Sequence, residues 1–409
     1  MRSRSARRLL VFVVALGVVG WLFVWLMGKK GDIQLGSDTS TMIGAMVLHE
    51  DGSQAVVIDP KGSVTKSSGY LAGRTDRDLA WGPDGNRLFF ISDRKEDSFH
   101  IFRWDPQRNA EPEQRSIDKA GRSNLVFEDK PAVDADLAGL VTVRGTVQEF
   151  FPVNGKSSQI LPPSKQRVEA EEGGGAGNTF ELLYNRFGKS FRVARWLKSK
   201  RFIAAVMRRE ERGETLIIQD FEPGKDGKIK PPIQIFSAER IEIDVDPASQ
   251  NLVANVIEVS PPEGEDGKPV KMGFIHGIFI IDPTKTGRDM IAPVLLSPDI
   301  KQCTTEIKCS PDGSTLLFIP ATYSGDGNGA SAGIASCPLK PQGATAGSPL
   351  VQGSVSSPSY SPDGTKITFI KREGAHRAVF IADSNGSNAR NLTGTTGDYS
   401  RPLFSPQYK

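Results

Sequence analysis

The chain has 409 residues, of which 38% are hydrophobic and 24% charged, with 42 Gly and 27 Pro. This composition excludes a disordered or collagen-like chain and provides for a large buried core. The 51 Lys and Arg residues nearly balance the 48 Asp and Glu residues, which argues against a nucleic-acid partner. With three Cys and four His, the chain has little material for a metal centre, so we expect no metal and no cofactor.

The first 41 residues predict a membrane anchor and a tether. A tail at residues 1–8 carries four arginines, and the uncharged run at residues 9–27 would form a helix of about 28 Å, close to a bilayer's hydrocarbon thickness. Because basic residues favour the cytoplasmic side, the tail is expected in the cytoplasm and the rest of the chain in the periplasm or outside. Residues 28–41 are polar and predict a tether. A cleaved secretory signal is the alternative, although the apolar run exceeds the usual length and no small-residue cleavage site follows.

Three copies of one turn signature follow, each between two apolar segments that predict strands. They occupy residues 82–85, 310–313 and 361–364 and read Gly-Pro-Asp-Gly or Ser-Pro-Asp-Gly. Pro fixes φ near about −65°, Asp can bond to its own backbone, and Gly accepts a positive φ as the next strand begins. The residues expected to build these turns, a structural role, are Pro83, Asp84, Gly85, Pro311, Asp312, Gly313, Pro362, Asp363 and Gly364.

Weaker copies fill the gaps between the three clear ones. The repeats begin near residues 81, 134, 196, 245, 309, 360 and 404, which are 44 to 64 residues apart. That spacing is typical of four-stranded propeller blades. The repeat at residue 404 stops at residue 409, and residues 42–68 supply its missing strands, so both termini are expected to close the last blade. The count favours seven blades, with six or eight as alternatives.

These turns, together with third strands such as residues 378–383, resemble the TolB-like, WD-repeat-like family of β-propellers. The resemblance covers residues 42–409. It implies an all-β fold consisting of a single β-propeller of four-stranded blades. It also implies a non-catalytic protein that binds other proteins in the bacterial cell envelope.

One face of such a propeller is the candidate binding surface. In a blade of up-and-down strands, the loops between second and third strands emerge on the same face as the blade-to-blade connections. Long loops at residues 162–189, 260–272 and 321–332 fall there. Function often resides on loops held by a rigid scaffold, although each loop is equally compatible with a solvated connection. The candidate partner-binding residues on this face are Arg94, Lys95, Arg208, Arg209, Arg212, Lys271, Lys371 and Arg372.

Three other patterns each have a structural alternative. A G-x-S-x-G match at residues 329–333 lacks the helix of a nucleophile elbow and predicts a hairpin instead. A basic, aromatic stretch at residues 186–212 fits an anionic partner, or a blade core with a charged edge. Cys303 and Cys309 fit a disulfide across a blade connection that leaves Cys337 unpaired, or all three are buried thiols.

The sequence therefore favours a single-pass, membrane-anchored, extracytoplasmic β-propeller that acts as a protein-interaction or envelope scaffold. Its expected partners are envelope or membrane proteins. One alternative is a propeller enzyme or enzyme subunit of lyase or hydrolase type, with its site in the central channel. Another is a surface sensor or carbohydrate-binding module. The channel alternative needs charged groups that converge from several blades, and the candidates are Asp134, Asp136, Asp244 and Asp246.

Overall fold

A computed structural model describes residues 42–82, 85–95, 98–108, 110–115, 122–128, 139–144, 147–152, 159–161, 190–198, 201–209, 212–220, 222–227, 230–260, 273–323, 329–341 and 347–406. The predictions for residues 1–41, Pro83, Asp84, Asp134, Asp136 and Lys271 lie outside the described residues. Within these ranges, no helix is long and apolar enough to cross a membrane.

The described elements are almost all β-strands, and they form six sheets. Four sheets have four strands each. The first has the order β28 (Asp398–Phe404), β1 (Ile43–His49), β2 (Gly52–Asp59), β3 (Ser63–Ser67), and the second has the order β4 (Asp76–Trp81), β5 (Leu88–Ser92), β6 (His100–Trp104), β7 (Glu113–Gln114). The third consists of β8 (Arg122–Glu128), β9 (Gly139–Arg144), β10 (Val147–Pro152) and β11 (Gln159–Leu161), and the fourth of β24 (Val355–Tyr360), β25 (Lys366–Glu373), β26 (His376–Asp383) and β27 (Arg390–Asn391). A fifth contains β19 (Gln302–Cys309), β20 (Thr315–Tyr323), β22 (Gly333–Pro338) and β23 (Ser348–Gln352), with β21 (Gly329–Ser331) paired to β20. The sixth has seven strands: β12 (Ser190–Leu197), β13 (Phe202–Arg208), β14 (Glu214–Asp220), β15 (Ile233–Val245), β16 (Leu252–Val259), β17 (His276–Ile281) and β18 (Ile291–Ser297), with a 3-10 helix, η3 (Gly287–Met290), before β18.

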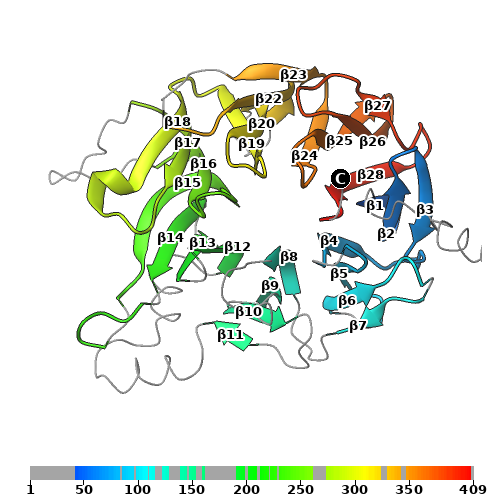
Figure 1. Ribbon diagram of the computed structural model, residues 1–409, viewed down its shortest axis with the longest axis horizontal. Helices are drawn as coiled ribbons and strands as arrows, with labels where there is room; N and C mark the ends of the chain where they lie inside the picture. The colour runs from blue at the N-terminus through cyan, green and yellow to red at the C-terminus, as the bar shows by residue number, and fades with distance from the viewer. Residues whose placement is uncertain are drawn as a thin grey trace, which may run out of the picture. The chain divides into compact units, whose positions relative to one another are not determined.

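Figure 1 shows these sheets arranged around a central axis, with one end of each strand order nearest that axis. The innermost strands are β28, β4, β8, β12, β15, β19 and β24; each contacts the next, and β24 contacts β28. A closed ring of radially arranged, mostly four-stranded antiparallel sheets is a β-propeller. The described part of the chain therefore has the predicted all-β propeller fold.

The two ends of the propeller segment meet in one sheet, as the sequence predicts. Strand β1 pairs with β28 in an antiparallel register that places Ile43 opposite Phe404. The Ser405 amide donates to the Met42 carbonyl at 2.9 Å, which extends this pairing. The neighbouring sheet is fastened to the same strand, because the Trp81 indole Nε1 donates to the Leu403 carbonyl at 3.0 Å.

The seven-stranded sheet has an internal joint at Ala238. This residue pairs with Glu214 of β14 and also with Val259 of β16. The N-terminal part of β15 is therefore the outer neighbour of β14, and its C-terminal part is the innermost strand beside β16. Gly213 lies against the joint, where an added Cβ would come within 2.6 Å of the Ala238 carbonyl oxygen.

The core lies between adjacent sheets, so the middle strands are covered on both faces. This is why β5 (LFFIS) and most of β13 (FIAAVMR) are buried at successive positions and read as continuous apolar runs. One such interface packs Trp81, Leu88 and Phe90 against Met46 and Val57 of the preceding sheet.

The three cysteines are free thiols and are buried. The sequence had left open a disulfide between Cys303 and Cys309 across a blade connection, but both residues belong to the single strand β19. Six steps of extended chain separate their Cα atoms by about 20 Å, far beyond disulfide geometry. The disulfide alternative is therefore wrong.

Candidate functional site

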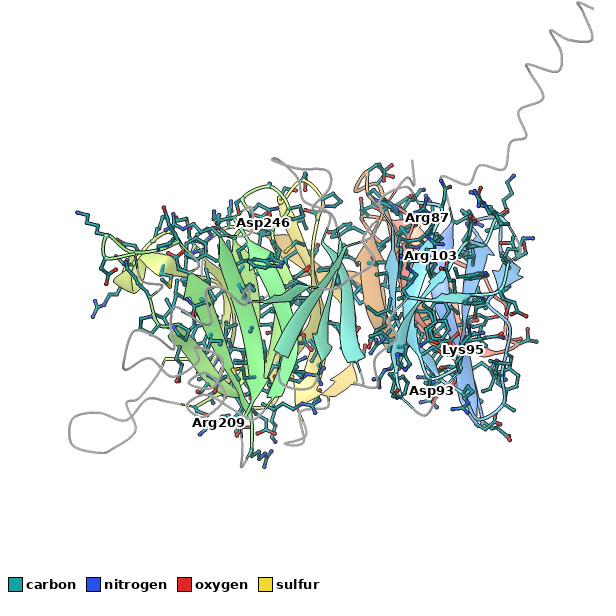
Figure 2. The ribbon with its side chains drawn as sticks, turned by 90° about the horizontal axis from the view of Figure 1, so that it is seen from below. Arg87, Asp93, Lys95, Arg103, Arg209 and Asp246 are labelled. Carbon is teal, nitrogen blue, oxygen red and sulfur yellow. The ribbon has the colours of Figure 1, made fainter. Side chains whose placement is uncertain are left out.

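The strand ends that lead into the predicted binding loops lie on one side of the ring, which we call the loop face, although residues 162–189, 261–272 and 324–328 of those loops lie outside the described residues. It consists of the connections after the second strand of each sheet and those between sheets. Figure 2 shows Lys95 and Arg209 at this side, whereas Arg87 and Asp246 lie at the opposite side. We call the opposite side the turn face, because the Pro-Asp-Gly turns lie there.

Several candidate cations on the loop face are exposed. Lys95, Arg208, Arg209 and Arg372 are exposed, and none of them forms an ion pair with another described residue. Arg212 is different, because its Nε atom lies 2.7 Å from Glu239 Oε2.

Lys371 is half-buried, and its Nζ atom lies 5.6 Å from the centroid of the Phe380 ring. The most accessible cations therefore come from the loop after β5, the loop after β13 and the end of β25.

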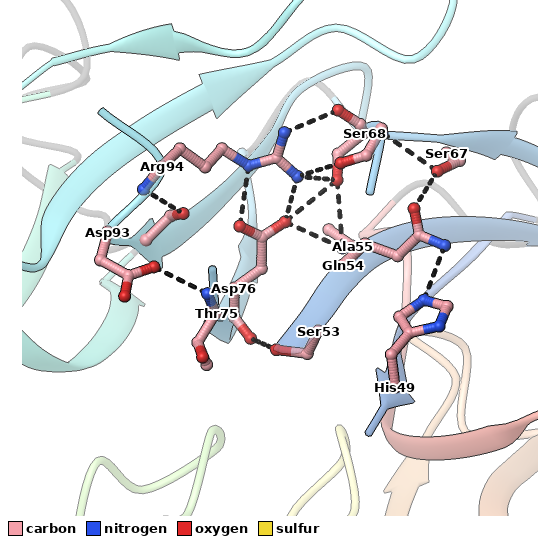
Figure 3. Close-up of polar contacts among 12 residues, drawn as sticks. His49, Ser53, Gln54, Ala55, Ser67, Ser68, Thr75, Asp76, Asp93 and Arg94 are labelled. Carbon is pink, nitrogen blue, oxygen red and sulfur yellow. Dashed lines mark hydrogen bonds and ion pairs between the residues drawn. The ribbon is translucent and has the colours of Figure 1, made fainter. Parts of the chain in front are cut away.

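Arg94 differs from these cations because its side chain is only 8% exposed. Its Nε atom donates to Asp76 Oδ1 at 2.8 Å and its Nη2 atom donates to Asp76 Oδ2, so the ion pair is bidentate. Its Nη1 atom also donates to the Ser68 carbonyl at 2.9 Å. Figure 3 shows the guanidinium directed into this cluster. Arg94 is thus turned into the chain, away from the surface that a partner would contact.

Asp76 is the centre of the cluster, and its side chain is 1% exposed. Its Oδ2 atom accepts hydrogen bonds from the Ala55 amide at 3.1 Å and from the Ser68 hydroxyl at 3.0 Å. The Ser53 hydroxyl donates to the Asp76 carbonyl at 2.6 Å. Such partners are what a buried carboxylate requires, since an unpaired buried charge costs several kcal/mol. The cluster joins two adjacent sheets, and no sequence motif marks Asp76, whose cationic partner lies 18 positions later.

A small apolar patch lies on the loop face beside this cluster. Tyr70 is 40% exposed and Leu71 is 44% exposed, both in the connection between β3 and β4. The Tyr70 hydroxyl donates to Asp51 Oδ1, and this hydrogen bond lowers the pKa of Asp51 and raises the pKa of Tyr70. No sequence pattern marks this patch, because two exposed apolar residues in a loop carry no periodic signal.

The central channel contains a cavity of about 390 Å³. Residues of β4, β12, β15, β19, β24 and β28 line it. Its charged lining residues are Asp78, Arg192, Glu242, Glu306, Lys308 and Arg401. Carboxylates and arginines therefore do converge in the channel, and Asp244 and Asp246 are not among its described lining residues.

Bulges in four innermost strands lie at the channel. The register shifts by one residue in β4, β19, β24 and β28, and at each shift one residue has a positive φ. These residues are Asp78, Glu306, Ser357 and Arg401, with φ of 55°, 54°, 54° and 51°. Each lies five positions before the proline of its repeat, as does Glu242 in a weaker copy. That spacing is a sequence signal that could have identified the channel residues.

The channel carboxylates bond to the backbone of the next innermost strand. Glu242 Oε2 accepts the Glu306 amide at 2.5 Å, and Glu306 Oε2 accepts the Ser357 amide. Burial raises the pKa of Glu306, and the neighbouring Glu242 charge raises it further. Arg401, in the sheet closed by both termini, donates to Asp78 of the neighbouring sheet. Each of these contacts links two adjacent sheets at a bulge.

Two of the predicted channel carboxylates have other positions. Asp244 accepts the Cys309 amide at 2.9 Å and so joins β15 to β19. Asp246 lies in a turn on the turn face, where its carboxylate accepts the Ala248 amide at 2.9 Å. Among the described residues, no group of three or more His, Cys, Asp and Glu side chains is placed to hold a metal ion.

In two of the Pro-Asp-Gly turns, the Asp carboxylate accepts hydrogen bonds from groups of the same turn. Asp312 accepts the Ser310 hydroxyl at 2.6 Å and the Ser314 amide at 3.0 Å, and these hydrogen bonds lower its pKa to about 2. Asp363 repeats the arrangement with the Ser361 hydroxyl at 2.5 Å and the Thr365 amide at 3.1 Å. The glycines of the three turns, Gly85, Gly313 and Gly364, have φ of 64°, 69° and 71°. A left-handed conformation of this kind explains why glycine ends each signature.

No protein-family model matches the chain, and no curated protein matches its sequence. Solved structures do match. A prolyl endopeptidase gives a TM-score of 0.52 at 10% identity, over 88% of this chain and 49% of that one. An oligogalacturonate lyase in complex with manganese gives 0.50 at 11% identity, over 86% and 84%. TolB from Acinetobacter baumannii gives 0.47 at 13% identity, over 90% and 67%. At such identities likeness concerns the fold alone, so the chain shares its architecture with proteins of several activities.

Proposed function

We propose that the chain is a membrane-anchored, extracytoplasmic β-propeller that binds other proteins of the cell envelope and has no chemistry of its own. In this proposal residues 9–27 are the anchor and residues 42–409 the propeller. The loop face is the binding surface, and its partner presents acidic groups.

The arrangement of exposed cations on the loop face supports this proposal most strongly. Lys95, Arg209 and Arg372 belong to three different sheets: Lys95 lies three residues after β5, Arg209 directly follows β13, and Arg372 is next to last in β25. Their spacing is therefore set by a rigid ring before any partner arrives, which lowers the entropy cost of binding. Fixed charges of one sign also steer an oppositely charged partner and select its orientation.

The proposal includes seven blades. The seven-stranded sheet counts as two blades that share β15, since Ala238 pairs with strands on both sides. Each half then has four strands, like four of the other five sheets. The seven innermost strands in the contact ring support the same count.

A channel enzyme is the second candidate, because the cavity of about 390 Å³ contains charged groups from several strands. The hydrogen bonds favour the scaffold over the enzyme. Glu242 and Glu306 already accept backbone amides of neighbouring strands, and Arg401 is paired with Asp78. A general acid or base needs a geometry in which it can reach substrate, and these groups are engaged in joining the sheets.

In-cell crosslinking of the full chain with a C-terminal tag, followed by detergent extraction, tests the proposal. We expect one partner in stoichiometric amount. The combined variant Lys95→Glu, Arg209→Glu and Arg372→Glu should lose that partner. A matched control reverses three exposed lysines in connections of the turn face, Lys225→Glu, Lys285→Glu and Lys340→Glu, and should keep it.

Two outcomes contradict the proposal. Equal capture by the loop-face variant and wild type would exclude the loop face as the binding surface. Capture of no protein by wild type would remove the scaffold hypothesis, and assays with glycans and with candidate lyase or hydrolase substrates would then decide between the alternatives.

A further inference from the structure

A groove of about 640 Å³ opens on the turn face between the sheet that begins with β19 and the sheet that begins with β24. Its two sides are the Pro-Asp-Gly turns at residues 310–313 and 361–364. Tyr360 and Leu350 line it between the turns, and the turn at residues 384–385 closes one end. The groove is within the size range of ligand sites and is separate from both the channel and the loop face.

The groove is negatively charged. Asp312 and Asp363 both line it, and none of the described residues that line it is basic. Hydrogen bonds within the Asp312 turn lower the pKa of that carboxyl to about 2. Burial opposes ionisation of Asp363, but hydrogen bonds from Ser361 and Thr365 prevail and lower its pKa. Both groups are therefore ionised at neutral pH.

The groove also offers an aromatic ring and hydroxyl groups that are not engaged elsewhere in the described chain. Tyr360 is half-buried and packs against the core of the β24 sheet. Burial raises its pKa, with the Asp312 charge adding to the effect, so the phenol stays neutral. The hydroxyls of Tyr360, Ser336 and Ser384 form no hydrogen bond with another described residue. The pocket thus holds unused donors and acceptors next to two fixed negative charges.

We propose that this groove binds a lysine or arginine side chain of a polypeptide segment of the partner. An aromatic ring beside carboxylates favours a cation, through its π face and through charge-assisted hydrogen bonds. Leu350 and Pro311 provide apolar contact for the aliphatic part of such a side chain. The free hydroxyls can bond to the cationic group and to the segment's backbone. This inference rests on the protein-binding role proposed above, and it places a second contact, of opposite charge preference, on the other face.

A peptide array tests the assignment. The purified full chain is applied to random 12-residue peptides, and the binders are then measured by fluorescence anisotropy with labelled copies. We expect the binders to contain Lys or Arg, and to lose affinity when these residues are replaced by Gln. The variant Ser384→Lys places a cation in the groove and should weaken binding by about tenfold or more. Ala389→Lys adds the same charge to an exposed neighbouring position outside the groove, and should leave affinity within about twofold.

Four results would overturn the inference. The first three are an absence of peptide binders, binders without Lys or Arg, and equal binding by wild type and Ser384→Lys. Binding to a glycan array that Ser384→Lys abolishes would assign the groove to a sugar and reject the peptide. Thermal unfolding of both lysine variants at the wild-type temperature confirms that the fold is unchanged.

The crosslinking experiment separates this inference from the proposed function. If the loop-face variant loses its partner while Ser384→Lys retains it, and no peptide binds the groove, the scaffold hypothesis stands and the groove inference fails. If peptides bind the groove but wild type captures no envelope protein, the groove inference stands and the scaffold hypothesis fails.

Discussion

The two faces of the propeller use charged side chains in opposite ways. On the turn face, Asp312 and Asp363 are held by hydroxyls and amides of their own turns. On the loop face, Lys95 and Arg209 are exposed and form no ion pair with another described residue. Arg94, next to Lys95, is the exception, since it is buried against Asp76. A cation on the loop face is therefore available to a partner only where it is not already paired with a buried carboxylate.

Replacing Arg94 is the strongest test of this contrast. The change Arg94→Ala leaves Asp76 buried without its cation, and we expect the free energy of unfolding to fall by about 3–5 kcal/mol. The control Lys95→Ala should change it by about 0.5 kcal/mol or less. Urea unfolding followed by tryptophan fluorescence measures both. Equal losses from the two variants would mean that the loop-face cations are alike, contrary to the structure.

A smaller loss of unfolding free energy should follow when the neutral hydrogen bond that helps to close the ring is removed. Trp81→Phe removes the indole donor to the Leu403 carbonyl and some buried volume, and we expect a loss of about 2 kcal/mol. Limited proteolysis provides the second measurement, because β28 should then become more accessible to cleavage than β25. Unchanged proteolysis of the C-terminal strand would show that the indole hydrogen bond does not secure the closure.

The turn carboxylates should make the free energy of unfolding fall as the pH becomes acidic. The folded-state pKa of Asp312 is about 2, below the ordinary 3.8, so the unfolded chain binds more protons between these values. Its contribution is present above about pH 4 and is lost as pH falls through about 2. Asp312→Asn should lose about 1 kcal/mol at pH 7 and show a shallower fall in stability at acid pH. Thermal melting at pH 7, 4 and 2.5 tests this, and an unaltered acid profile would contradict it.

The smallest change in the free energy of unfolding, a gain and not a loss, is expected in the channel. The pKa of Glu306 is raised, so the folded state binds more protons than the unfolded state above pH 4.5. Its ionised form thus costs stability, and the cost grows as pH rises through the raised pKa. Glu306→Gln can still accept the Ser357 amide, so it should be neutral or stabilise by less than about 1 kcal/mol at pH 8. A loss of more than that in urea unfolding at pH 8 would show that the charge itself is needed.

Local chemistry explains which features were predictable from the sequence. The Pro-Asp-Gly turns depend on adjacent residues only, and the strands on either side of them were found from the same signature. The pairing of β1 with β28 was predictable because an incomplete repeat lay at each end. The role of Arg94 was not, because its partner Asp76 is brought to it by sheet packing and not by any spacing along the chain.

The channel shows a different reason for a missed site. Asp78, Glu242, Glu306 and Arg401 share one position in the repeat but not one residue type, so a search for similar residues passes over them. Asp78, Glu306 and Arg401 also share a backbone bulge with a positive φ, whereas β15 is regular at Glu242. The disulfide between Cys303 and Cys309 was wrong for a related reason, because the sequence does not show that the six steps between them are extended strand. A loop of that length could bring the two Cα atoms together, whereas a strand keeps them apart.

The pairing of β28 with β1 also has a consequence for the order of events in the cell. Strand β28 is the innermost strand of the sheet that contains β1, β2 and β3, yet it follows all other described strands in the chain. Because synthesis runs from the N-terminus, one edge of β1 stays unpaired while the intervening sheets are made. We therefore expect the ring to close only after translation has reached residue 404. Until then the newly synthesised chain depends on protection of the unpaired edge of β1.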